Sequence, residues 1–377
     1  MDNKDMTQAS TVADPAGSRS TPFSSNSLRL SGAEWIVVLV LFAASLVFGP
    51  LLWSRIETFD PEPNYRLPYE LGSDYWLYSR YCGRACSQDK TLIIGDSVIW
   101  GHYVRPESTL SGYLNEKTAS DRFANLGVDG IHPAALAGLL GYYARAISGK
   151  DVILHLNPLW MCSRKVDLQD SKEFRFNHPK LVPQFTPRIP CYRAQFSGKA
   201  SIIAERYSTF LSWASHLRIA YFDALDLPTW TLEHPYENPL KAVTLKLPAV
   251  DTYDEKEHVS WTQKGLRKQG HDWVKLETSI QWRFFKASVD TLRSRRNNVF
   301  VLVGPFNEHM LTQSSVEKYH EMKRAIESWL QQSGLAYYIP PPLPSELYRD
   351  ASHPLSDGYA SLAQQLLASE SFRAFMK

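Results

Sequence analysis

The chain of 377 residues is 44% hydrophobic and 21% charged, a composition that fits a globular protein with a substantial core. Its formal net charge of +2 gives no reason to expect a nucleic-acid binder. The sequence contains neither a His–Cys cluster with zinc spacing nor a phosphate-binding glycine loop, so we expect no metal and no organic cofactor.

The N-terminal part predicts a polar tail followed by a membrane segment. Residues 1–33 are rich in Ser, Thr, Asp and Asn and are expected to be disordered. An uncharged apolar run of 19 residues then extends from Trp35 to Trp53, which is about 28 Å as a helix and matches the bilayer core. We predict an uncleaved, single-pass (type II) anchor over residues 34–54. A cleaved signal peptide is the alternative, although its apolar part is usually shorter.

Residues 55–90 contain several prolines and tyrosines and are expected to link the anchor to a globular domain at 91–377. The four cysteines are Cys82, Cys86, Cys162 and Cys191. An even count in an exported protein indicates two disulfides, with Cys82–Cys86 and Cys162–Cys191 as the local pairing. Four free thiols are the alternative. Disulfides would place the large C-terminal part outside the cytoplasm, in the periplasm or the extracellular space.

From residue 91 onward, apolar runs alternate with segments of helical periodicity. This alternation predicts an α/β fold with a five-stranded, mostly parallel sheet between two helical layers. About 140 residues separate the third strand from the fourth, which indicates an insertion at 159–297, aromatic-rich at first and helical from residue 260. The expected strands are 91–94, 122–126, 151–156, 298–303 and 335–339, and the expected helices are 132–148, 315–332 and 355–372.

The first strand runs directly into Gly95-Asp96-Ser97. A buried strand that ends in a tight turn with a hydroxyl group is where α/β enzymes place a nucleophile. A serine needs a base, and Asp350-Ala-Ser-His353 follows the fifth strand, so His353 can deprotonate Ser97 while Asp350 orients the imidazole. The alternative is an ordinary capped turn with Asp350 and His353 at the surface.

An acyl-transfer site also needs hydrogen-bond donors for a developing oxyanion. Gly127 follows the second strand and can offer its backbone N–H, and Asn157 follows the third strand and can offer its side-chain amide. Taken singly, these are a turn glycine and a capping residue. Together with the Ser97 N–H they supply every part of such a site.

In this order of blocks the chain resembles the SGNH (GDSL-type) hydrolase superfamily, over about residues 91–157 and 298–372. The stretch from Gly95 to Leu114 is similar to membrane-anchored bacterial SGNH proteins, some of which act in O-acetylation of polysaccharides. The resemblance implies Ser97 as nucleophile, His353 as base, Asp350 as its orienter, and Ser97, Gly127 and Asn157 as the oxyanion hole. The third block departs from the usual Gly-x-Asn-Asp, because His155-Leu-Asn157-Pro replaces it.

The expected function is therefore a serine-dependent O-acyl (O-acetyl) hydrolase or transferase that acts on an extracytoplasmic glycan. The anchor and the resemblance also suggest a multi-span membrane acyltransferase as a partner. The aromatic insertion could stack sugars through Trp160, Phe174 or Tyr192, although core packing is the more common role of such residues. The alternatives are a non-catalytic glycan-binding or assembly protein and an intracellular lipase-like enzyme with free thiols.

Overall fold

The structure, a computed structural model, describes residues 30–61, 63–247 and 258–377. These residues belong to two compact units, 1–48 and 49–377. Most of the predicted disordered tail lies outside the described residues.

Helix α1 (Gly32–Ile56) covers the predicted anchor. It begins with a reciprocal cap, because the Glu34 N–H donates to the Ser31 hydroxyl (3.3 Å) and the Ser31 N–H donates to the Glu34 carboxylate (2.7 Å). With a mean hydropathy of 2.5 it is long and apolar enough to cross a membrane, and a signal sequence passes the same test.

The second unit is built on a five-stranded sheet in which every strand pair is parallel, in the order β2-β1-β3-β4-β5. The predicted α/β class with a parallel sheet is confirmed. The order reverses between β1 and β3, and the carboxyl ends of strands on either side of such a switch point form the usual ligand crevice. The strands are β1 (Thr91–Ile94), β2 (Phe123–Asn125), β3 (Asp151–Leu156), β4 (Asn298–Val303) and β5 (Ala336–Tyr338).

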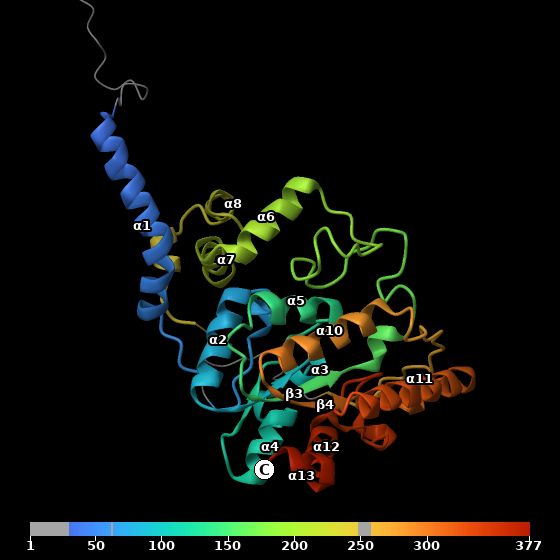
Figure 1. The fold of residues 1–377 in the computed structure, drawn as a ribbon. Coiled ribbons are helices and arrows are strands. Elements are labelled where there is room, and N and C mark those ends of the chain that lie inside the picture. Colours follow the sequence, from blue (N-terminus) through green and yellow to red (C-terminus); the bar gives the residue numbers. More distant parts are fainter. Residues whose placement is uncertain (1–29, 62, 248–257) are drawn as a thin grey trace, which may run out of the picture. The chain divides into compact units, whose positions relative to one another are not determined.

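Helices cover both faces of this sheet, as Figure 1 shows. Along β1, Leu92 and Ile94 join the core of one face while Ile93 joins the core of the other. Burial on both faces explains why these strands read as continuous apolar runs. One face packs against α2 (Tyr75–Ser87), α5 (Pro133–Tyr142), α10 (Ile280–Ser294) and α11 (Gln313–Gln332), and the other against α3 (Ser97–Trp100), α4 (Leu110–Thr118), α12 (Ser356–Ala368) and α13 (Glu370–Phe375).

Residues 55–90, predicted as a linker, are largely part of this unit. Helix α2 is capped by the Asp74 carboxylate, which accepts from the Leu77 N–H at 3.0 Å. Its Leu77 and Tyr78 side chains are fully buried in the core. Tyrosines and arginines are interspersed along this segment, so its sequence pattern did not distinguish an amphipathic helix from a connecting loop.

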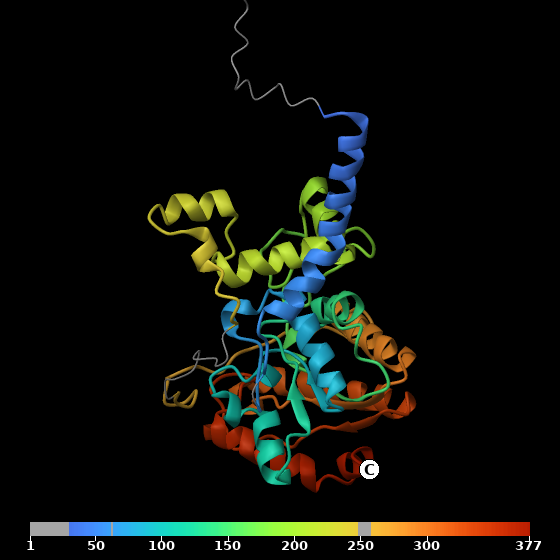
Figure 2. The same ribbon diagram turned by 90° about the vertical axis from the view of Figure 1, so that its left-hand side faces the viewer.

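The segment between β3 and β4 contains α6 (Phe196–Tyr207), α7 (Thr209–Tyr221), α8 (Leu227–Glu233) and α9 (Pro239–Ala242), seen together in Figure 2. The helix predicted from residue 260 begins only at Ile280, as α10. Because α10 packs on the sheet beside α5, the end of the predicted insertion is the crossover that leads into β4. Short 3₁₀ turns complete the described part: η1 (Tyr69–Leu71), η2 (Pro106–Ser108), η3 (Pro158–Met161), η4 (Glu308–Met310) and η5 (Ser345–Leu347).

All four cysteines are free thiols in the structure, so neither predicted disulfide is present. Cys82 and Cys86 lie one turn apart on α2, where their Cβ atoms project side by side rather than toward each other. Cys162 and Cys191 are buried in the core. The cysteines therefore give no support to an extracytoplasmic location.

Candidate active site

Ser97 stands at the tip of the turn that follows β1, at the switch point of the sheet. A Cβ atom on Gly95 would lie 2.7 Å from the Cβ of His155, so glycine lets the turn pass close to β3. The Asp96 carboxylate then caps α3 by accepting from the Val98 N–H at 3.0 Å. Glycine and aspartate in the triplet thus serve to place Ser97 as the first residue of a helix.

The structure brings Ser97, His353 and Asp350 together across 256 residues of sequence. The Ser97 Oγ lies 2.8 Å from His353 Nε2, and His353 Nδ1 lies 2.8 Å and 2.9 Å from the two Asp350 oxygens. A carboxylate can only accept, so Nδ1 carries the proton and Nε2 accepts from the Ser97 hydroxyl. This is the tautomer in which histidine can act as the base for serine.

The loop that carries Asp350 and His353 is held by several hydrogen bonds. Asp350 Oδ1 accepts from the backbone N–H groups of Ser352 and His353, both at 3.0 Å. The fully buried Asn307 side chain, which follows β4, donates to the Asp350 carbonyl oxygen at 3.0 Å. These contacts fix the carboxylate independently of the imidazole, as orientation of the base requires.

Burial and charge act in opposite directions on this pair. Burial alone would raise the pKa of Asp350, but the charge and hydrogen bond of His353 outweigh it and lower the pKa to about 2. Burial would lower the pKa of His353, but Asp350 outweighs it and raises the pKa above its ordinary value. The site therefore stabilises an imidazolium, the species that forms when His353 takes the Ser97 proton.

The predicted oxyanion donors are placed unequally. Among the described residues the Ser97 N–H, at the start of α3, has no hydrogen-bond partner and remains available. The Gly127 N–H already donates to Asn125 Oδ1 at 3.0 Å. A Cβ atom on Gly127 would lie 2.3 Å from the Trp100 nitrogen, so close packing against α3 explains this glycine. The next glycine, Gly130, has a φ of 68° and, within the described residues, an N–H without a partner, a donor that the sequence analysis did not single out.

Asn157 follows the end of β3 and lies beside the turn that carries Ser97. Its Oδ1 accepts from the Leu159 N–H at 3.0 Å, which fixes the orientation of the amide. Its Nδ2 donates to Asp96 Oδ2 at 2.8 Å. An amide nitrogen has two protons, so one of them stays available for a substrate oxygen.

Asp96 is the centre of a buried network that the sequence analysis treated only as a capping residue. Besides Asn157, the Trp160 indole donates to Asp96 Oδ2 at 2.8 Å, and His155 Nδ1 lies 3.2 Å from Oδ1. Burial would raise the pKa of Asp96, but His155 and these donors lower it. Trp160, considered above as a sugar platform, thus has a structural contact, and the unusual His155 of the third block supports the nucleophile turn.

His102 and Tyr103 border the triad, although a surface or structural role was expected for His102 and Tyr103 was not singled out. The His102 ring centroid lies 5.4 Å from that of His353, and its Nδ1 lies 2.7 Å from Asp129 Oδ1. The Tyr103 ring meets the His353 ring edge-on at 5.5 Å. Tyr103 has a φ of 74°, which is uncommon for a bulky residue and often marks a functional site.

The other aromatic candidates lie in the segment after β3. Phe174 and Tyr192 each pack against Phe176, with ring centroids 6.1 Å and 5.7 Å apart. All three are partly buried against the main core. Their positions fit core packing at the edge of the domain.

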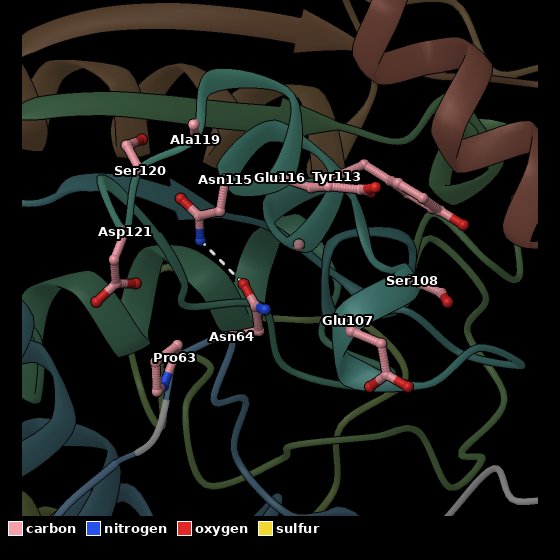
Figure 3. Close-up of a pocket in the computed structure, with 11 residues that line it drawn as sticks. Pro63, Asn64, Glu107, Ser108, Tyr113, Asn115, Glu116, Ala119, Ser120 and Asp121 are labelled. Carbon is pink, nitrogen blue, oxygen red and sulfur yellow. Dashed lines mark hydrogen bonds between the residues drawn. The ribbon is translucent and has the colours of Figure 1, made fainter.

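A surface hollow of about 790 Å³ lies elsewhere, along α4 and the turns before and after it (Figure 3). None of its lining residues belongs to the triad. Asn115 in its wall donates to the Asn64 side chain at 3.0 Å and pairs with the Phe123 backbone through both ends of its amide. These bonds give Asn115 a structural role, and the hollow offers no nucleophile paired with a base.

Within the described part of the chain, no group of three or more His, Cys, Asp or Glu residues is arranged to hold a metal ion. Comparison of the chain with protein-family models and with curated proteins gives no match. The case for a function therefore depends on the geometry of the Ser97 site.

Proposed function

We propose that this protein is a serine-dependent O-acyl hydrolase or transferase that forms an acyl-enzyme on Ser97. The observation that carries the proposal is the continuous set of contacts from Ser97 Oγ through His353 to Asp350, each within 2.9 Å. A strand-turn-helix element presents the serine at a switch point, and the pKa shifts of Asp350 and His353 favour proton transfer to the imidazole.

In the proposed reaction, Ser97 Oγ attacks the carbonyl carbon of an ester while its proton passes to His353 Nε2. The negative oxygen of the tetrahedral intermediate accepts hydrogen bonds from the Ser97 N–H and from the second proton of the Asn157 amide. His353 then returns its proton to the leaving alcohol oxygen, and the acyl group stays on Ser97. In the second half, His353 deprotonates the acceptor, whose oxygen attacks the acyl carbon; the bond to Ser97 Oγ then breaks, and His353 returns the proton to that oxygen.

Water as acceptor makes the protein an esterase, and a sugar hydroxyl makes it an acyltransferase. The resemblance to SGNH proteins of polysaccharide acetylation supports an acetyl group and a glycan substrate, and the apolar helix α1 supports attachment to a membrane. A periplasmic or extracellular catalytic domain, and a multi-span acyltransferase as acyl donor, belong to the same proposal.

The test uses the full chain in detergent micelles with an acetyl ester, such as p-nitrophenyl acetate, with and without an acceptor oligosaccharide. We expect acetate or acetylated sugar to form, and mass spectrometry to find an acetyl group on Ser97. Ser120→Ala, an exposed serine at the opposite edge of the sheet, is the matched control for Ser97→Ala. Acetate release that does not change with acceptor would exclude transfer, and no acyl turnover under either condition would contradict the proposal.

The hydrogen bonds of Gly127 and Asn157 favour a second candidate, a non-catalytic glycan-binding or assembly protein. Two of the three predicted oxyanion donors, Gly127 and Asn157, contact acceptors inside the protein, as expected if the fold were kept for binding. This candidate predicts that Ser97→Ala and His353→Ala leave the cellular phenotype intact while the proposed enzyme predicts its loss.

The four free thiols agree with an intracellular enzyme, the third reading of the sequence. A topology-reporter fusion at the C-terminus separates the two locations. A cytoplasmic signal would contradict the extracytoplasmic part of the proposal while leaving the chemistry of Ser97 in place.

A further inference from the structure

Arg349 is a buried arginine without a conventional partner, next to the proposed catalytic loop. Arg349 is 9% exposed, and its backbone N–H donates to the His353 carbonyl oxygen at 2.9 Å. Within the described residues its guanidinium has no carboxylate partner, and Nε and Nη1 are shielded from solvent without any hydrogen bond. Buried arginines are normally paired, because an unpaired buried donor costs about 1–3 kcal/mol.

The other two arginines that are buried in the described part of the chain make the contrast clear. Arg66 donates to the carbonyl oxygens of Trp100 and Gly101 at 3.0 Å and 2.7 Å. Arg206 donates through Nε to the Lys180 carbonyl oxygen at 3.0 Å. The fold therefore supplies backbone acceptors to Arg66 and Arg206, whereas no described residue accepts a hydrogen bond from Nε or Nη1 of Arg349.

The position of Arg349 relates it to the triad. Its Cζ lies 5.2 Å from the centroid of the Tyr103 ring, within cation–π range. The same ring meets His353 edge-on at 5.5 Å and lies 5.0 Å from the ring of His258. Tyr103 holds this place with a left-handed backbone, directly after the α3 cap at Gly101. The Tyr103 ring thus lies against both the Arg349 guanidinium and the proposed base, His353.

We propose that Arg349, supported by Tyr103, binds a carboxylate of the substrate, so that the site selects O-acylated acidic glycans over neutral ones. A planar guanidinium matches a carboxylate and gives charge-assisted hydrogen bonds. Because Arg349 lost most of its hydration on folding, an anion that reaches it does not incur that cost again. Asp350 does not compete for this cation, since its oxygens are taken by His353 and two backbone N–H groups.

This inference deepens the proposed function and rests on it for the ester, but its test does not require turnover. The full chain with Ser97→Ala, in detergent micelles, is titrated with galacturonic acid trisaccharide, with neutral galactotriose and with galactose 6-phosphate by calorimetry. We expect the acidic trisaccharide to bind about tenfold tighter than the neutral one, which corresponds to about 1.4 kcal/mol. A phosphate-bearing sugar that binds more tightly than the uronate would overturn the assignment of a carboxylate.

Arg349→Met in the same background should abolish the difference between acidic and neutral sugars, and Arg349→Lys should keep part of it through its point charge. Arg373→Met, an exposed arginine on α13, is the matched control and should leave the difference unchanged. If thermal unfolding shows that Arg349→Met does not fold, the Arg349→Lys variant is used in its place, and a reduced difference in affinity between acidic and neutral sugars is expected. Equal affinities for acidic and neutral sugars in the Arg349 protein would overturn the inference, whatever the turnover assay shows for Ser97.

Discussion

Of the histidines that contact carboxylates, His353 and His216 differ most in what faces the second ring nitrogen, and that difference distinguishes a catalytic role from a structural one. His353 faces Asp350 on one ring nitrogen and the Ser97 hydroxyl on the other. His216, on α7, is fully buried between two carboxylates, with Nδ1 2.6 Å from Asp74 and Nε2 2.9 Å from Glu57. A hydroxyl group can donate a proton and a carboxylate cannot. His353 Nε2 can therefore accept the Ser97 proton, whereas His216, with a carboxylate at each ring nitrogen, is protonated on both nitrogens.

The surroundings of His216 indicate a structural link. Burial would lower the pKa of His216, but Asp74 and Glu57 raise it to about 9. Glu57 also accepts from Tyr221 and Trp53 and pairs with Arg80, while Asp74 caps α2. The imidazolium therefore joins α7 of the segment between β3 and β4 to α2 of the core, at a place that exchanges no proton with a substrate.

Removal of the nucleophile should have the largest effect on activity. We expect Ser97→Ala to reduce acyl turnover by roughly 10⁴-fold or more, because the carbonyl then has no serine oxygen to attack it. Thermal unfolding should change little, since Ser97 contributes one hydroxyl contact. Steady-state kinetics with an acetyl ester and a melting curve on the same preparation measure both; turnover that survives would place the reaction elsewhere.

The next largest effect should come from Asp350→Asn, which favours the wrong imidazole tautomer and should lower kcat/KM by roughly 10³–10⁴-fold. His353 must be neutral to accept the Ser97 proton, so activity is lost as the pH falls through its pKa. Asp350 raises that pKa, and its loss should move the acid limb of the pH profile to lower pH. Asp357→Asn, an exposed residue on α12, should leave the limb in place.

Replacement of His216 should lower the stability of the protein more than its activity. His216→Ala leaves Glu57 and Asp74 buried without their shared cation, which should destabilise the protein by about 3–5 kcal/mol. The matched control is His320→Ala, because the His320 side chain is 42% exposed and pairs with Glu308. This substitution should lower the free energy of unfolding by at most about 1 kcal/mol. Melting temperatures of the two variants test this, and equal losses would contradict a special role for His216.

The smallest expected effect is the pH dependence that His216 gives to stability. Its pKa is raised from 6.5 to about 9 in the folded protein, so its contribution is complete below pH 6.5 and is lost as the pH rises toward 9. The pKa of Glu57 is lowered to about 2, so its contribution is complete above pH 4.5 and is lost as the pH falls toward 2. The melting temperature should decline between pH 6.5 and 9 in the wild type and much less in His216→Gln.

Much of the fold could be predicted from local pattern. The runs Asp151–Leu156 and Asn298–Val303 are strands with the predicted bounds, because strands buried on both faces are apolar throughout. The amphipathic helix α2 was missed, because its mixture of tyrosines and charged residues is also typical of a connecting loop. Which of its residues are buried depends on packing against the sheet. The disulfides were expected from the cysteine count, which carries no information about the distance between thiols.

By itself the sequence determined the class of sheet and the blocks that hold Ser97, Asp350 and His353, because strand order along the chain decides which loops share an edge. The partners of the polar groups, in contrast, became evident only in the folded chain. The tertiary structure directs the Gly127 N–H to Asn125, makes Asp96 a buried acceptor and confines His216 between two acids, and among the described residues it gives Arg349 no acidic partner. Hydrogen bonds and ion pairs depend on distances of a few ångströms between residues far apart in the chain, which residue types and spacing do not specify.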